Sequence, residues 1–175
     1  MNAIAFLKTM QEKVAISAVG PSALRGQGKG LLSATQQVLK DMDLSKMPMG
    51  GQEDFQSWLN DQTTRILEAM PITSPPWGAA RKALNLFLRD ALYNRYLCME
   101  YRVDRAEHWL EIPLDSAVAK GLIDKDIQGN LPPWPRLKRL VKHDSDKYQR
   151  FAEALAAKEG IARVHLDITL WLKNR

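Results

Sequence analysis

The sequence is very short of cysteine. A single cysteine, Cys98, occurs among 175 residues, so no intramolecular disulfide and no cluster or zinc site built from several thiolates can form. The three histidines, at positions 108, 143 and 165, share no spacing typical of metal ligands. We therefore expect neither a disulfide framework nor a metal centre.

Long apolar runs are also absent. The first apolar run stops at Lys8, and no stretch reaches the roughly 18 uncharged apolar residues that a membrane span needs. Residues 2–17 fit either an amphipathic surface anchor or a core-facing first helix. These absences favour a cytoplasmic protein that does not associate with membranes.

What the chain does contain is typical of a globular protein. It has 45% hydrophobic and 26% charged residues, and its length fits one domain over residues 1–175, or two small lobes flanking a cleft. The 25 basic and 20 acidic residues leave a net charge of +5, and the pI is about 9.4. This surplus favours an anionic partner.

Apolar residues recur at helical rather than alternating spacing between the glycines and prolines. The pattern predicts a first helix that ends near residue 19. Further helices are predicted over about 31–42, 52–70, 77–101, 116–122, 145–158 and 161–173. Asp115 is placed to cap the helix that starts at Ser116. Residues 164–171 (VHLDITLW) also fit a strand, but one without a partner. The prediction is an all-α, compact helical domain of about seven to nine helices.

The predicted helix over 77–101 has one polar face and one apolar face. The polar arc holds Arg81, Lys82, Asn85 and Arg89, and the opposite arc, expected to face the core, holds Ala80, Leu84, Phe87, Leu88 and Ala91. Cations at a helix N-terminus are unfavourable. The polar arc is therefore a solvated face, a phosphate site, or a site in which Lys82, partly desolvated by Trp77, acts as an amine nucleophile.

Two short segments carry a family resemblance. Residues 78–88 read GAARKALNLFL and residues 113–120 read PLDSAVAK. The first resembles the catalytic hairpin of the helix-hairpin-helix (HhH-GPD) DNA glycosylases, and the second resembles the aspartate segment downstream of it. The matching positions are Gly78, Arg81, Lys82, Asn85, Leu88, Asp115, Ser116, Val118 and Lys120. The resemblance implies a helix-hairpin-helix-like element near residues 66–88 and a cleft between helical lobes.

The resemblance also implies a role for each matching residue. Lys82 would attack C1′ of the sugar as the base leaves, and Asp115 would stabilise the sugar cation and assist proton transfer. The DNA would be held by the remaining positions on and near the hairpin, which are Gly78, Ala80, Arg81, Asn85, Arg89 and Lys120. The target base would leave the stack, with Trp77, Trp109 and Trp134 as pocket walls or as a wedge.

The sequence departs from the family pattern at three points. Ala80 replaces the second hairpin glycine, residues 71–77 (PITSPPW) replace a compact hairpin, and Lys82 and Asp115 are 33 positions apart (115 − 82). The single cysteine excludes the branch of the family that carries an iron–sulfur cluster. The best match is a compact, divergent member without a cofactor.

Two further basic segments fit the same interpretation. The turn at residues 25–30 (RGQGKG) is an interhelical turn or a DNA-backbone contact through Arg25 and Lys29. Residues 136–143 are basic and amphipathic, and form either a solvated face or a second backbone contact.

The sequence therefore predicts a DNA glycosylase with AP-lyase activity that acts on double-stranded DNA, without a cofactor or an obligate protein partner. The base would be an oxidised purine or a naturally modified base. The alternatives are a non-catalytic helical DNA- or RNA-binding protein, and an adaptor for an acidic protein surface.

Overall fold

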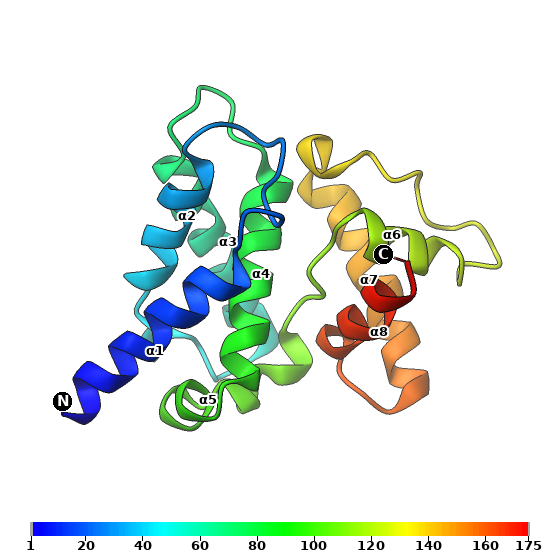
Figure 1. Cartoon of the computed structure of the whole chain (residues 1–175). Coiled ribbons are helices and arrows are strands. Elements are labelled where there is room, and N and C mark those ends of the chain that lie inside the picture. The colour runs from blue at the N-terminus through cyan, green and yellow to red at the C-terminus, as the bar shows by residue number, and fades with distance from the viewer. Residues whose placement is uncertain (1, 175) are drawn as a thin grey trace.

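The computed structural model describes residues 2–174 and is built from helices throughout (Figure 1). The α-helices are α1 (Ala3–Ala18), α2 (Leu31–Lys40), α3 (Gln52–Ala69), α4 (Trp77–Tyr93), α5 (Arg95–Tyr101), α6 (Ser116–Ile123), α7 (Lys142–Glu159) and α8 (Leu166–Asn174). Short 3-10 helices lie at η1 (Leu44–Lys46), η2 (Val103–Trp109), η3 (Leu137–Arg139) and η4 (Arg163–His165). The predicted all-α class is confirmed for the described residues.

The helices form two groups that meet at α4 (Figure 1). In the first group, α4 contacts α1, α2, α3 and α5, and in the second group α6 packs against α7 and α8. Helix α4 also contacts α7 and η3. Its side chains therefore contribute both to the core and to the junction between the groups.

The sequence correctly predicted the core side of α4. All five residues of the predicted apolar arc are fully or almost fully buried: Ala80, Leu84, Phe87, Leu88 and Ala91. Burial of this stripe against the surrounding helices is the main stabilisation of α4, because an isolated helix of this length is marginal in water.

Helix boundaries differ from the prediction where a side chain interrupts or starts a helix. The predicted helix over 77–101 is two helices, because Asn94 ends α4 and its Oδ1 accepts hydrogen bonds from the N–H groups of Tyr96 and Leu97. The basic segment 136–143 is not one amphipathic helix, since two extended residues, Leu140 and Val141, separate η3 from the start of α7 at Lys142. The possible strand over 164–171 lies instead in η4 and α8.

The element expected near residues 66–88 consists of the end of α3, a connector over residues 70–76, and the start of α4. Helices α3 and α4 pack against each other.

None of the helices within residues 2–174 combines the length and apolar character that a membrane span requires.

Candidate active site

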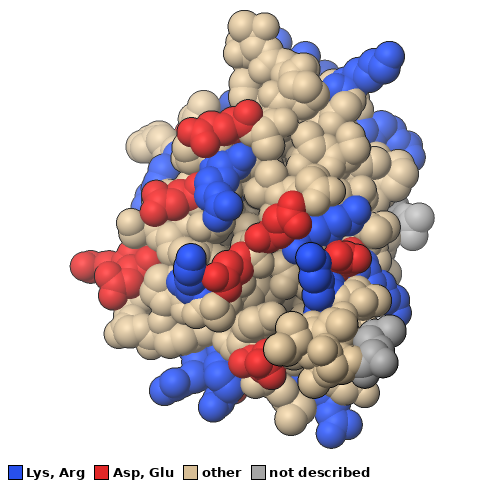
Figure 2. All heavy atoms as spheres, turned by 90° about the vertical axis from the view of Figure 1, so that its left-hand side faces the viewer, with Lys and Arg blue, Asp and Glu red and all other residues tan. Residues whose placement is uncertain are grey.

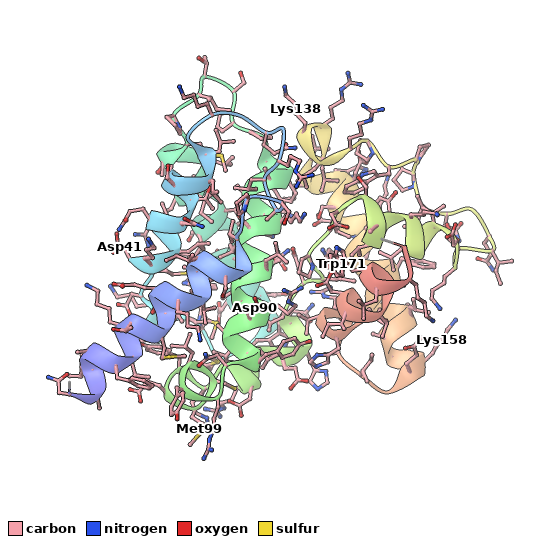
Figure 3. All side chains as sticks on the ribbon, in the orientation of Figure 1. Asp41, Asp90, Met99, Lys138, Lys158 and Trp171 are labelled. Carbon is pink, nitrogen blue, oxygen red and sulfur yellow. The ribbon has the colours of Figure 1, made fainter. Side chains whose placement is uncertain are left out.

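A pocket of about 630 Å³ lies where α4 faces the start of α6 and the last helix, α8. Two of the residues that line it are labelled in Figure 3, Asp90 on α4 and Trp171 on α8. The lining combines charged and aromatic side chains with small and apolar ones: Ala18, Ser22, Ala23, Arg25, Lys82, Leu86, Arg89, Asp90, Tyr93, Asp115, Asp167, Ile168, Trp171 and Leu172.

Lys82 and Asp115 meet in this pocket. Nζ of Lys82 lies 3.3 Å from Oδ2 of Asp115, although the two residues are 33 positions apart (115 − 82). Lys82 is 9% exposed, so its amine is largely shielded from bulk solvent. A shielded amine beside a carboxylate in a pocket has the composition of an amine-nucleophile site.

The two oxygens of Asp115 face different groups. Oδ1 accepts hydrogen bonds from the backbone N–H groups of Ala117 and Val118, each at 3.0 Å, and this confirms the predicted N-cap of α6. A helix N-terminus favours a negative charge. The cap fixes the side chain so that Oδ2 is left for Lys82.

A second charged cluster lines the pocket beside this pair. Arg89 is paired with Asp90 of its own helix and with Asp167 of α8. Burial raises the pKa of Asp167 to about 6, with a further rise from Asp115, while Arg89 and Lys82 oppose it. Since Lys82 and Asp115 act on this pKa, the two clusters form one electrostatic unit.

The aromatic part of the pocket is formed by Tyr93 and Trp171. The Tyr93 hydroxyl lies 2.8 Å from Nδ1 of His165, and the two rings are stacked with centroids 5.7 Å apart. Nε2 of His165 lies 2.5 Å from a carboxylate oxygen of Glu107. This chain of contacts fixes the orientation of the Tyr93 ring at the pocket wall.

Sequence reasoning missed Tyr93, Asp90, Asp167 and Trp171. A signal was present for Asp167, because it is the one charged residue in the stretch 166–172, in which five of the seven residues are apolar. Buried carboxylates are rare unless they are paired. Nothing in the sequence, however, indicated that this stretch faces Arg89.

The polar arc of α4 is not a solvated basic face, which was one of the three alternatives that the sequence left open. Arg81 is 2% exposed, and Asn85 is also buried. Both side chains hydrogen-bond to the buried carboxylate of Glu111. Neither side chain is placed at the surface, where the predicted contact with DNA would require it. Of the four residues, Lys82 and Arg89 line the pocket.

Gly78 and Ala80 serve packing rather than a phosphate-binding turn. Gly78 lies in the first turn of α4, and a Cβ there would meet the Leu137 carbonyl oxygen at 2.4 Å and Cβ of Leu140 at 2.7 Å. Ala80 is fully buried. The predicted hairpin contact with DNA is not available at these two positions, because η3 covers Gly78.

The three tryptophans chosen from the sequence do not line the pocket. The Trp77 ring lies under the Arg81 guanidinium, 5.4 Å from its centroid. Trp109 packs on Phe55, and Trp134 packs on Tyr148 while its Nε1 donates to the Ser116 hydroxyl. None of the three therefore forms a wall of this pocket, and a role as a wedge stays a prediction.

Two of the predicted basic segments, 25–30 and 136–142, lie near the connector before α4 or the start of α4. Arg25 lines the pocket, and the turn that carries Lys29 packs through Gly28 and Gly30 on residues 71–72. The segment 136–142 is held beside Gly78 by η3. Lys120 is exposed on α6 and does not line the pocket. On the face shown in Figure 2, by contrast, basic and acidic side chains are interspersed.

Within residues 2–174, no three His, Cys, Asp or Glu side chains gather as metal ligands do. The chain matches no protein-family model, no curated protein and no solved structure.

Proposed function

We propose that the chain is a DNA glycosylase with AP-lyase activity, in which Lys82 is the amine nucleophile and Asp115 is its electrostatic and proton-transfer partner. The observation that carries the proposal is the 3.3 Å contact between Lys82 Nζ and Asp115 Oδ2 inside the pocket. The resemblance to the HhH-GPD glycosylases required these two residues to meet, and their distance in sequence gave no reason for them to do so.

The chemistry requires a neutral amine at Lys82. Asp115 is placed to take the lysine proton through Oδ2, while the α6 N–H groups hold Oδ1. The amine then attacks C1′, and the base leaves with the electron pair of the glycosidic bond and takes up a proton. Nζ then releases a proton and O4′ takes one up as the sugar ring opens, which gives a protonated imine between Nζ and C1′. Loss of a C2′ proton then expels the 3′ phosphate.

The rest of the pocket suits a base turned out of the duplex. Tyr93 and Trp171 supply aromatic surface, and about 630 Å³ is enough room for a purine or a modified pyrimidine. The exposed cations at Arg25, Lys29 and along 136–142 border the start of α4. There they can neutralise the phosphates on either side of the extruded nucleotide.

Borohydride trapping tests the proposal. The protein is incubated with duplex DNA that carries an abasic site, an oxidised purine or a hydroxymethylated cytosine, and the imine is then reduced. We expect a covalent adduct with wild type, none with Lys82→Ala, and a strongly reduced amount with Asp115→Asn. Lys158→Ala, which removes an exposed lysine on α7, is the matched control and retains the adduct.

The absence of an adduct on every substrate, with all variants folded, would contradict the enzyme. Salt-sensitive DNA binding without an adduct would then favour the second candidate, a helical DNA- or RNA-binding protein. The exposed basic segments at 25–29 and 136–142 are the observation that favours this candidate. A cytoplasmic location stays a prediction.

A further inference from the structure

The segment that delivers Asp115 to the pocket has no regular secondary structure. Residues 110–115 lie between η2 and α6, and residues 110–114 are buried. Buried backbone polar groups outside helices still need hydrogen-bond partners, and side chains can supply them. Gln149 of α7 bonds to both the N–H and the carbonyl of Ile112, and Arg163 donates to the carbonyls of Trp109 and Leu110. These contacts tie the segment to the second group of helices.

Glu111 ties the same segment to α4. Arg81 binds its carboxylate with two prongs, from Nε at 2.9 Å and from Nη2 at 3.2 Å, and Asn85 adds a bond at 3.0 Å. Burial acts to raise the pKa of Glu111, but the Arg81 charge, the Asn85 hydrogen bond and the Arg163 charge bring it below its usual range. Glu111 is thus an ionised carboxylate that is 3% exposed.

Arg81 in turn is fixed from α3. Its Nη1 donates to the Leu59 carbonyl and the Thr63 hydroxyl, and its Nη2 donates to Asn60 Oδ1. With the two bonds to Glu111, the guanidinium makes as many bonds as it has N–H donors. Oδ1 of Asn85 has no partner among the described residues, so this amide serves Glu111 alone.

We propose that Arg81 and Glu111 are positioning residues that set the register between Lys82 and Asp115. Arg81 is adjacent to Lys82 on α4, and Glu111 lies four positions before Asp115 at the buried end of the irregular segment. A rigid two-pronged bond between Arg81 and Glu111 therefore fixes how far along α4 the segment lies. That distance decides whether Oδ2 of Asp115 reaches Nζ of Lys82.

The inference rests on the proposed function for its catalytic consequence, but its geometry is testable without DNA. A water-soluble carbodiimide activates a carboxylate, and a lysine amine in contact with it displaces the urea to form an amide. We expect wild type to form the Lys82–Asp115 amide, detected as a crosslinked peptide by mass spectrometry. In Glu111→Gln and Arg81→Lys the yield should fall several-fold, because the charged two-pronged bond is lost.

Gln11→Leu is the matched control for lost stability. Gln11 is another buried polar side chain that makes several bonds, in its case to the Leu39, Lys40 and Met42 carbonyls at the end of α2. It touches neither the segment 110–115 nor the pocket. Its variant should lose stability and keep the wild-type crosslink yield.

Glu111→Asp distinguishes the effect of the position of the segment along α4 from the effect of the carboxylate charge. It keeps the carboxylate but shortens the side chain by one methylene, so it should retain more stability than Glu111→Gln and still lose crosslinking. In single-turnover trapping at saturating DNA, we expect the rate to fall about 10-fold to 100-fold in the Glu111 variants, as for a displacement of about 1 Å. DNA affinity should stay unchanged.

A wild-type crosslink yield in folded Glu111→Gln or Arg81→Lys overturns the inference, and so does the absence of the crosslink in wild type. If wild type crosslinks and its variants do not, yet no DNA is trapped, the positioning role stands and the proposed function fails.

Discussion

Asp167 on α8 forms an ion pair with Arg89 on α4 across the pocket. Asp90 holds the same guanidinium, with its Oδ1 at 2.7 Å from Nη2. One cation is therefore shared by two carboxylates, and Asp167, which is the more buried of the two, bears the cost of desolvation. The pKa of Asp167 near 6 is the consequence.

The desolvation of the Asp167 carboxylate should make the stability difference between wild type and Asp167→Asn depend on pH. The pKa of an unfolded aspartate is near 3.8 and that of the folded Asp167 is near 6. Between about pH 4 and pH 6, Asp167 is therefore protonated in the folded protein and ionised in the unfolded chain. Stability from this group is thus present below about pH 4 and is lost as the pH rises through 6. The measured quantity is the free energy of unfolding of wild type minus that of Asp167→Asn. We expect this difference to fall by on the order of 2–3 kcal/mol from pH 4 to pH 7.

Urea denaturation at a series of pH values measures this difference. Asp124→Asn, which removes an exposed carboxylate after α6, is the control. A difference that rises with pH would mean that the Arg89 ion pair outweighs burial, contrary to the prediction.

If the chain binds DNA as proposed, Lys138→Ala should weaken that binding through the loss of one contact with a phosphate. Lys138 projects from η3 beside the start of α4, whereas Lys158 projects from the end of α7 on another side of the molecule (Figure 3). We expect the slope of log affinity against log salt concentration to fall by about 1 in Lys138→Ala. Fluorescence anisotropy at several salt concentrations measures it. An equal fall in Lys158→Ala would show that binding follows net charge and not this surface.

Gly78→Ala should destabilise the protein although alanine is the better helix former. The new Cβ would lie 2.4 Å from the Leu137 carbonyl oxygen, which is backbone and cannot swing aside. Displacement of η3 should cost about 1–3 kcal/mol, more than the roughly 1 kcal/mol gained in helix propensity. Thermal unfolding compares it with Gly20→Ala, where nothing lies within 4 Å. A stabilised Gly78→Ala would mean that η3 does not pack on α4.

Asn94→Ala should destabilise α5 by about 1 kcal/mol, because the two N–H groups that Asn94 caps lose their acceptor. Asn94→Asp keeps an acceptor and should stay close to wild type in chemical denaturation. Equal stability of wild type and Asn94→Ala would instead favour the continuous helix over 77–101.

The parts of the fold that follow from local sequence were predictable. The apolar stripe on α4 and the N-cap at Asp115 each depend on residues within a few positions of one another, so their signals are present in the sequence. The break at Asn94 was also a local signal, since asparagine is a strong N-cap, but the helical periodicity on both sides concealed it.

The candidate site was predictable only in part. Lys82 and Asp115 came from a resemblance, and their contact depends on how the segment 110–115 crosses α4. Arg81 and Asn85 looked like surface residues because periodicity gives the direction of a side chain and not what covers it. Their burial required Glu111, a residue 30 and 26 positions further along the chain, and no local pattern links them.

Lys82 belongs to the first group of helices, whereas Asp115 begins the second. The ion pair between them therefore exists only while the two groups are docked. If α6, α7 and α8 separated from α4 with their helices intact, circular dichroism would change little. The Lys82–Asp115 crosslink would disappear, and it can thus serve as a sensor of docking in variants whose helix content is normal.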